Sequence, residues 1–282
     1  MTNRHCLVCN SNLGPSRYAG LLQCVECSFI TADVCLSSEE LAALYGANYF
    51  FGEEYSDYLA DRKTIQRNFH NRLHVLLRYV KDPSGKRLFE IGSAYGLFLD
   101  VARPSFQSVE GIDVSQPATE YARSALGLNV SSGDFLDHDP HPPVDVACMW
   151  DTIEHLQSPH LYIEKVSKVM PAGSIIAITT GDISSRMAQF RGQKWRQIHP
   201  PTHLHYFSRS TLERLLNRYG FDVRYCGFDG AYRSLDMIAA ILLKVRRNRP
   251  AIYDALKRTG LLKRDLYLNL FDIVYMIGEK RA

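Results

Sequence analysis

An acidic residue and a turn of small residues stand together in the stretch R-L-F-E-I-G-S-A-Y-G, which begins at residue 87. Glu90 is followed at alternate positions by Gly92, Ala94 and Gly96. Such a turn lets backbone N–H groups approach a nucleotide-like ligand closely. Asp113 comes 21 residues after Gly92, at the spacing where an acidic side chain accepts the two hydroxyls of a ribose. The spacing predicts a nucleoside site. The alternative is a plain tight turn, with Asp113 capping the next helix.

The charge of Glu90 distinguishes among the cofactors that such a site could hold. A dinucleotide brings two phosphates to the turn, where a carboxylate would repel them. S-adenosylmethionine carries a sulfonium and an ammonium and no phosphate, so Glu90 predicts this cofactor. Asp134, in the sequence G-D-F, stands at the expected end of the third strand. Its carboxylate could accept from an adenine amino group there, or it could cap the loop.

Three histidines and one aspartate are the candidates for catalysis. Methyl transfer from a sulfonium is an in-line displacement, and a neutral hydroxyl or amine acceptor must also lose a proton, for which histidine is suited. His203 and His205 alternate in a proline-stiffened stretch and are expected on one face, with His203 the leading base. Asp151 and His155 stand four apart and share a face if a helix begins there. The histidines could instead bond buried backbone groups. A metal is not expected at the stretch with His203 and His205, because no third ligand is evident there.

Four cysteines near the start of the chain have the spacing of a metal site. Cys6 and Cys9 form one C-x-x-C pair, Cys24 and Cys27 form another, and 14 residues separate the pairs. Four thiolates close a tetrahedral zinc shell and leave no open position, so the zinc is expected to be structural. Disulfides or unrelated thiols are the alternative.

The elements that must position these residues alternate along the chain. Apolar runs predict strands at 88–91, 108–113, 129–134, 144–150, 174–180 and 221–228, with a last, antiparallel strand at 267–278. Amphipathic patterns predict helices at 65–80, 116–126, 159–169 and 208–219. This alternation is typical of an α/β protein with a doubly wound parallel sheet.

The chain resembles the class I S-adenosylmethionine-dependent methyltransferases, whose first motif is an acidic residue followed by G-x-G-x-G, here with Ala94 as the middle residue. W-D-x-x-E-H-L at 150–156 and the P-x-G turn before the fifth strand extend the resemblance over about 85–230. A small-molecule branch with an N-terminal four-cysteine zinc ribbon is similar also through 45–58 and 195–207. The resemblance implies a Rossmann-like, mostly parallel seven-stranded sheet with helices on both faces. The predicted cofactor-binding set is Glu90, Gly92, Ala94, Tyr95, Gly96, Asp113, Val114, Gly133, Asp134, Phe135, Trp150 and Asp151.

The chain divides into three parts on these patterns. Residues 1–36 are the expected zinc ribbon, 37–84 a helical and aromatic-rich linker or lid, and 85–282 the methyltransferase domain with a helical insertion at about 231–266. The basic segment 244–249 could bind an anionic or carrier-linked acceptor, or could be a solvated face.

The composition of the chain bears on its partners and on where in the cell it works. The 282 residues carry a net charge of +3, too mild to indicate nucleic acid. The polar N-terminus predicts no signal peptide, and no apolar run approaches the ~20 residues of a membrane span. We therefore expect a cytoplasmic protein, with oligomers left open.

The resemblance names the methyl donor better than the acceptor. We expect methylation of a small molecule, first at oxygen of a sugar or secondary metabolite. The alternatives are N-methylation of a ribosomal RNA base, C- or N-methylation of a nucleotide-linked sugar, and a non-catalytic cofactor-binding module. Residues 1–36 carry only Arg4 and Arg17 as permanent cations, which argues against RNA.

Overall fold

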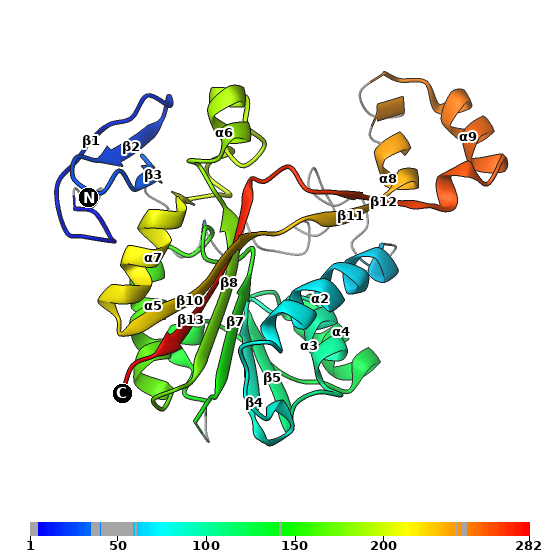
Figure 1. Cartoon of the computed structure of the whole chain (residues 1–282). Coiled ribbons are helices and arrows are strands. Elements are labelled where there is room, and N and C mark those ends of the chain that lie inside the picture. The colour runs from blue at the N-terminus through cyan, green and yellow to red at the C-terminus, as the bar shows by residue number, and fades with distance from the viewer. Residues whose placement is uncertain are drawn as a thin grey trace.

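The computed structural model describes residues 5–34, 40, 59, 61–140, 143–240, 242–243 and 247–282. A seven-stranded sheet forms its centre, in the order β10-β13-β8-β7-β4-β5-β6 (Figure 1). The strands are β4 (Arg87–Ile91), β5 (Ser108–Asp113), β6 (Asn129–Ser132), β7 (Val146–Trp150), β8 (Ile175–Gly181), β10 (Phe221–Phe228) and β13 (Ile273–Lys280). Only β13 runs against its neighbours in this sheet. The predicted fold class is confirmed.

Two hydrophobic cores cover the two faces of the sheet. Successive strand residues point to opposite faces, so Ala147 and Met149 enter one core while Val146 and Cys148 enter the other. The first core packs under α5 (Pro159–Val169) and α7 (Arg209–Arg218). The second packs under α2 (Arg62–Leu76), α3 (Leu97–Ala102) and α4 (Gln116–Leu126). Every residue of β7 and β8 is buried, as expected for parallel strands with helices on both sides.

The N-terminal cysteine segment shares a sheet with the main domain. Strands β1 (Leu13–Pro15), β2 (Leu21–Cys24) and β3 (Ile30–Ala32) form an antiparallel sheet, whose fourth strand is β9 (His205–Tyr206). Phe29 packs against Phe207, with ring centres 5.1 Å apart. The histidine stretch therefore connects the cysteine segment with the central sheet.

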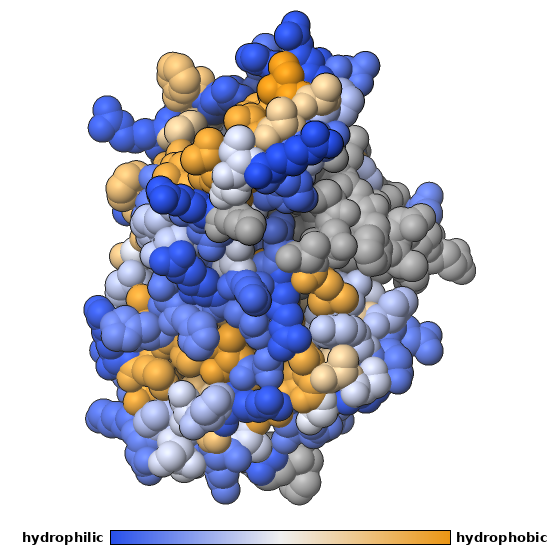
Figure 2. Space-filling model, turned by 90° about the vertical axis from the view of Figure 1, so that its right-hand side faces the viewer, coloured by the Kyte–Doolittle hydropathy of each residue, from blue (hydrophilic) through white to orange (hydrophobic). Residues whose placement is uncertain are grey.

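A smaller unit follows β10 at the carboxyl edge of the sheet (Figure 1). It contains β11 (Ala231–Ser234), α8 (Leu235–Ala239), α9 (Pro250–Arg258) and β12 (Asp265–Leu268), and β11 pairs with β12. Figure 2 shows apolar side chains gathered over this unit at the top of the molecule. The exposed ones include Leu242, Ile252, Leu261, Leu266 and Leu268.

The predicted last strand at 267–278 is wrong as one element, because the chain breaks between β12 and β13. The side chain of Asn269 accepts a hydrogen bond from the Phe271 N–H at 2.8 Å, and Phe271 has a φ of +55°. This turn directs the next residue, Asp272, toward Trp195 and Arg196. A local side-chain bond thus outcompetes continued strand pairing.

The remaining regular elements are short. They are α6 (Arg186–Arg191) and the 3₁₀ turns η1 (Pro83–Gly85), η2 (Phe135–Asp137), η3 (Gly192–Lys194) and η5 (Leu261–Lys263). The predicted segment 45–58 and the basic residues 244–246 lie outside the described residues. Among the helices that are described, none has the length and apolar character needed to cross a membrane.

Candidate active site

The turn after β4 has the backbone shape that its small residues predict. Gly92 has a φ of +76°, and a Cβ atom there would lie 2.5 Å from Cγ2 of Thr152. Ala94 also adopts a positive φ, +44°, and Gly96 precedes α3 with a φ of +72°. Glycine is required at 92 both by the backbone conformation and by the close approach of the segment after β7.

Glu90 brings a buried carboxylate to this turn. Its side chain is only 2% exposed, and among the described residues Oε2 has no hydrogen-bond partner. Burial, together with the nearby charge of Asp113, raises the pKa of Glu90 well above its usual value, although Arg72 opposes the shift. A buried carboxylate oxygen without a partner is costly unless a cation or donor reaches it. The residues therefore fit a cationic, phosphate-free ligand.

Asp113 and Asp134 stand at the ends of the next two strands. The carboxylate of Asp113 accepts from the Ala94 N–H at 2.7 Å and from the Ser115 N–H at 2.8 Å. It thus ties the turn to the end of β5, and each oxygen keeps a second lone pair for a ligand hydroxyl. Asp134 accepts from the Leu136 N–H at 2.8 Å and from the Tyr162 hydroxyl.

The other predicted cofactor residues divide by their exposure. Val114 is exposed beside Asp113, and Gly133, whose φ is +142°, is half-buried. Tyr95, Phe135 and Trp150 are instead buried in the cores. The Trp150 ring contacts Phe98 and Tyr275, so its side chain fills the core under α2 and does not form an open wall.

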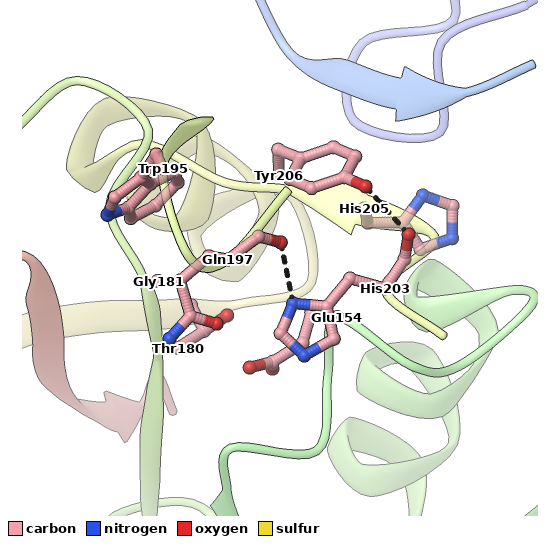
Figure 3. Close-up of a pocket in the computed structure, with 8 residues that line it drawn as sticks. All are labelled: Glu154, Thr180, Gly181, Trp195, Gln197, His203, His205 and Tyr206. Carbon is pink, nitrogen blue, oxygen red and sulfur yellow. Dashed lines mark hydrogen bonds between the residues drawn. The ribbon is translucent and has the colours of Figure 1, made fainter. Parts of the chain in front are cut away.

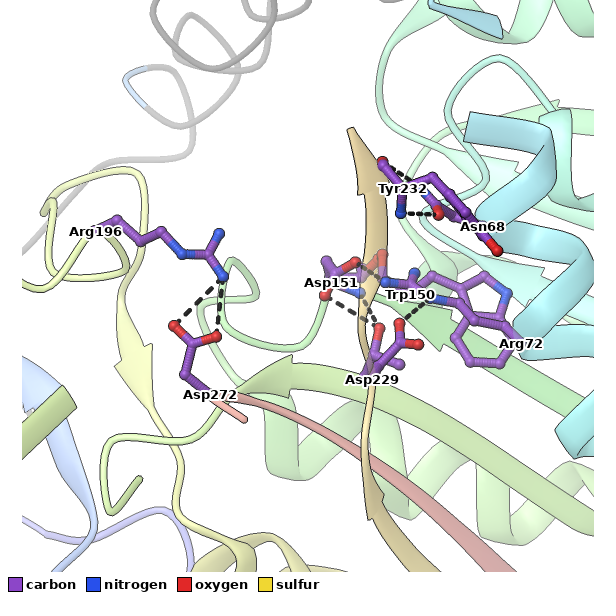
Figure 4. Close-up of polar contacts among 10 residues, drawn as sticks. Asn68, Arg72, Trp150, Asp151, Arg196, Asp229, Tyr232 and Asp272 are labelled. Carbon is purple, nitrogen blue, oxygen red and sulfur yellow. Dashed lines mark hydrogen bonds and ion pairs between the residues drawn. The ribbon is translucent and has the colours of Figure 1, made fainter. Parts of the chain in front are cut away.

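Asp151 follows β7 in a strained conformation and joins an ion-pair network (Figure 4). Its φ is +51°, and its side chain is 43% exposed. Arg72 of α2 donates through Nη2 to Asp151 at 2.8 Å and through Nε to Asp229 at 2.7 Å. Thr179 also donates to Asp151, at 3.1 Å. The part of the carboxylate that is withdrawn from water would raise the pKa of Asp151, but the charge and hydrogen bond of Arg72 outweigh this effect and lower that pKa.

Arg72 is a residue of this site that the sequence did not single out. It lies on the sheet-facing side of α2, beside Phe69 and over the Trp150 ring, whose centre is 5.5 Å from its guanidinium carbon. An arginine within an otherwise apolar helix face was the available signal. The predicted helix 65–80 contains it.

Replacing Arg72 with methionine is expected to leave Asp151 and Asp229 as uncompensated like charges. The free energy of unfolding should fall by about 3 kcal/mol and Tm by roughly 10 °C, measurable by calorimetry. Arg62→Met removes only the surface pair with Asp100 and should change stability by less than ~1 kcal/mol. Equal stability of the two variants would contradict the view that Arg72 compensates the charges of Asp151 and Asp229.

His203 lies close to Glu154 and His155, which follow β7; Figure 3 shows His203 and Glu154. Its Nδ1 donates to the carbonyl oxygen of Gln197 at 2.9 Å, and Nδ1 of His155 donates to that of Thr202 at 2.9 Å. Glu154, His155 and His203 each bring a ligand atom within 4.8 Å of the others. We name these three residues the Glu-His-His cluster. Burial, with the charges of His155 and His199, lowers the pKa of His203 well below its usual value.

His205 borders the same pocket as His203, but its ring contacts the cysteine segment (Figure 3). Nδ1 lies 3.0 Å from the Thr31 hydroxyl, Nε2 lies 3.4 Å from the Gln157 carbonyl oxygen, and the ring stacks on Phe29. Burial lowers the pKa of His205 to about 4. Because its two nitrogens contact Thr31 and Gln157, His205 links β9 to β3. His155, which follows β7, instead contacts His203.

The four predicted zinc ligands lie together at the start of the chain. Their sulfur atoms are mutually within 4.8 Å, with Cys6 3.5 Å from Cys27 and Cys9 3.4 Å from Cys24. Backbone N–H groups of Val8 and Cys27 donate to the sulfurs of Cys6 and Cys24. Sulfurs that accept such bonds are typical of thiolate ligands to a metal.

A parallel sheet with one reversed strand, a positive-φ turn beside a buried acid, and acids on the next strand ends together define a class I methyltransferase. Such an enzyme transfers a methyl group from S-adenosylmethionine. The chain belongs to the methyltransferase-domain family, which matches residues 60–225, more than half of its length.

Solved structures agree with this fold. The YcgJ protein of Bacillus subtilis is 14% identical with a TM-score of 0.55, covering 76% of this chain and 99% of its own. An S-adenosylmethionine-dependent methyltransferase of Clostridium acetobutylicum is 11% identical (TM-score 0.51; 84% and 98% covered). Magnesium protoporphyrin IX methyltransferase of Synechocystis, solved with bound SAH, is also 11% identical (TM-score 0.57; 87% and 100% covered). No curated protein matches the chain.

Proposed function

We propose that the enzyme methylates an oxygen of a small molecule and that the acceptor's proton is removed at the Glu-His-His cluster. The buried Oε2 of Glu90, which has no hydrogen-bond partner within the described part of the chain, is the observation that carries the choice of donor. S-adenosylmethionine brings the reactive methyl group as part of a cation, and Glu90 would balance that charge. Asp113 and Asp134 would hold its ribose and adenine.

The acceptor would enter at the carboxyl edge of the sheet, between Asp151 and His203. Asp151 comes directly after β7, and His203 lies in the segment that follows β8. Open α/β sheets bind ligands at these carboxyl ends of their strands. The exposed apolar residues of the unit with α8 and α9 support an acceptor with an apolar part, such as a carrier-linked one. Neutral His203 suits proton removal, because Nδ1 is already a donor and Nε2 keeps its lone pair.

We also propose that Cys6, Cys9, Cys24 and Cys27 hold a structural zinc ion. Its role would be to fix β3, and through β3 the strand β9 that carries His205. The ribbon then positions the histidine loop without touching the reacting atoms.

Incubation with methyl-labelled S-adenosylmethionine tests the function. Pools of small hydroxylated molecules, nucleotide-linked sugars and ribosomal RNA are offered separately. The proposal predicts label in small molecules as a methyl ether. Label on carbon or nitrogen of a nucleotide-linked sugar, or on RNA, would overturn the choice of acceptor.

Changing His203 to asparagine is expected to lower turnover by ~100-fold while cofactor affinity stays within about 3-fold of wild type. Asparagine keeps a donor for the Gln197 carbonyl and removes Nε2. Turnover and calorimetric binding are measured on the same preparation. A variant with normal turnover would place proton removal elsewhere.

Cofactor binding is expected to release a proton from Glu90. Its pKa is raised in the free protein, and a bound cation would lower it, so the carboxylate ionises on binding. Affinity should therefore rise with pH up to the raised pKa of the free enzyme and then level off. Calorimetry in buffers of different ionisation enthalpy counts the proton. The count should vanish in Glu90→Gln, and an equal count in that variant would refute the assignment.

A further inference from the structure

The Glu-His-His cluster brings together residues that are far apart in the chain. Glu154 and His155 follow β7, whereas His203 comes from the loop before β9. Glu154 is 3% exposed and His203 is 5% exposed, so the group is not a chance meeting of surface side chains. From the sequence alone, no third ligand was evident for the stretch with His203 and His205. In the folded chain Glu154 supplies one, because its ligand atom lies within 4.8 Å of both histidine ligand atoms.

Both imidazole rings are oriented as metal ligands usually are. A backbone carbonyl only accepts hydrogen bonds, so the contacts with Gln197 and Thr202 place a proton on Nδ1 of each ring. A neutral ring then presents its Nε2 lone pair. Metal-binding histidines almost always donate their other N–H to a carbonyl or carboxylate, which fixes the ring's orientation. These two Nδ1 contacts favour an ion independently of the close grouping of the three ligand atoms.

The ring geometry also fits. The centres of the His155 and His203 rings are 4.5 Å apart, with an angle of 84° between their planes. Two imidazoles bound through Nε2 to one ion at ~2.1 Å, with ~90–110° between the bonds, have centres roughly 4.5–5 Å apart. The two rings therefore need little movement to share an ion.

We propose that Glu154, His155 and His203 bind one divalent cation of the zinc or manganese type. Two imidazoles and one carboxylate are a ligand set that such ions accept while keeping open positions for water or substrate. This inference rests on the proposed function and deepens it by assigning the means of proton removal. With the ion bound, His203 acts as a ligand, and the ion does the work of making the acceptor acidic.

The chemistry of the step balances without a further reagent. An acceptor hydroxyl in contact with the ion has a lowered pKa, so its O–H bond breaks and the proton passes to water. The oxygen pair forms the new bond to the methyl carbon. The carbon–sulfur bond breaks and its electron pair stays on sulfur, which converts the sulfonium to a neutral thioether.

Titration with Mn²⁺ tests the site in protein that carries one zinc ion per chain, enough for the four-cysteine site alone, and the electron paramagnetic resonance signal of free Mn²⁺ follows the binding. Manganese favours oxygen ligands such as a carboxylate over thiolates, whereas the four-cysteine site favours zinc. Wild type should bind one Mn²⁺ per chain. Glu154→Gln and His203→Asn should each weaken binding by at least ~10-fold. His74→Asn, on the exposed side of α2, is the matched control and should bind as wild type does.

The outcomes separate this inference from the proposed function. Methyl transfer is measured in parallel before and after mild chelation, with zinc content counted to show that the cysteine site stays loaded. Mn²⁺ binding that is absent in wild type, or equal in wild type and Glu154→Gln, would overturn the metal site whether or not methyl transfer occurs. Near-ultraviolet circular dichroism of each variant confirms that it is folded.

Discussion

Glutamine in place of Glu90 is expected to raise the Kd for S-adenosylmethionine by about 100-fold. The change keeps the shape of the side chain but removes the only charge on it, so a cationic ligand loses its buried partner. Breaking a buried charge pair costs about 3 kcal/mol or more, which corresponds to this change in Kd. Calorimetric titration measures it.

Glu110→Gln is the matched control for that experiment. Glu110 lies opposite Phe89 on the neighbouring strand and pairs with Arg87 at 2.8 Å, away from the turn. Its Kd should match wild type. If the Glu90 variant bound the cofactor as tightly as the Glu110 variant, the buried carboxylate would have no part in binding the donor.

Serine in place of Cys24 is expected to remove the zinc and unfold the N-terminal sheet. Structural zinc contributes about 10–16 kcal/mol of binding free energy in small domains, far more than three short strands can supply. Since β9 pairs with β3, the histidine loop should lose its support, and turnover should fall to background. Zinc analysis and limited proteolysis before residue 34 measure the first effect, and methyl transfer measures the second.

Cys226→Ser provides the control, because Cys226 is exposed on β10 and lies outside the four-cysteine cluster. It should keep full zinc content and turnover. A Cys24→Ser enzyme with normal turnover would show that the ribbon does not hold the histidine loop in place.

Elements with a local signal were predictable from the sequence. The unbroken apolar run of β7 marks a strand buried on both faces. Pro117 near the start of α4 and Gly127 after its end, with a φ of +64°, bound that helix. The spacing between the turn and Asp113 likewise predicted their meeting, because adjacent parallel strands end at the same edge.

Features that depend on distant contacts were not predictable. The pairing of β9 with β3 joins residues more than 170 positions apart, and a two-residue strand carries no pattern of its own. In the sequence Arg72 is a single charge within a helix, and only the fold shows that it pairs with Asp151 and Asp229. Glu154 reads as part of a motif until the fold places it beside two histidines.

Trp150 shows the limit of reading a side chain from its strand position. The end of β7 is at the carboxyl edge, and this position alone would place an indole beside the cofactor. The indole instead turns to the face covered by α2 and packs against Phe98 and Tyr275. Alternation along the strand decides the face, and the neighbouring Cys148 lies on that same side.

Whether the site binds S-adenosylmethionine is measured by calorimetric titration of the purified, zinc-loaded wild-type chain with S-adenosylmethionine, with its demethylated product SAH and with NAD⁺. We expect one bound S-adenosylmethionine and one bound SAH per chain, and no heat of binding with NAD⁺. Binding of NAD⁺ with no response to either sulfur compound would contradict this expectation.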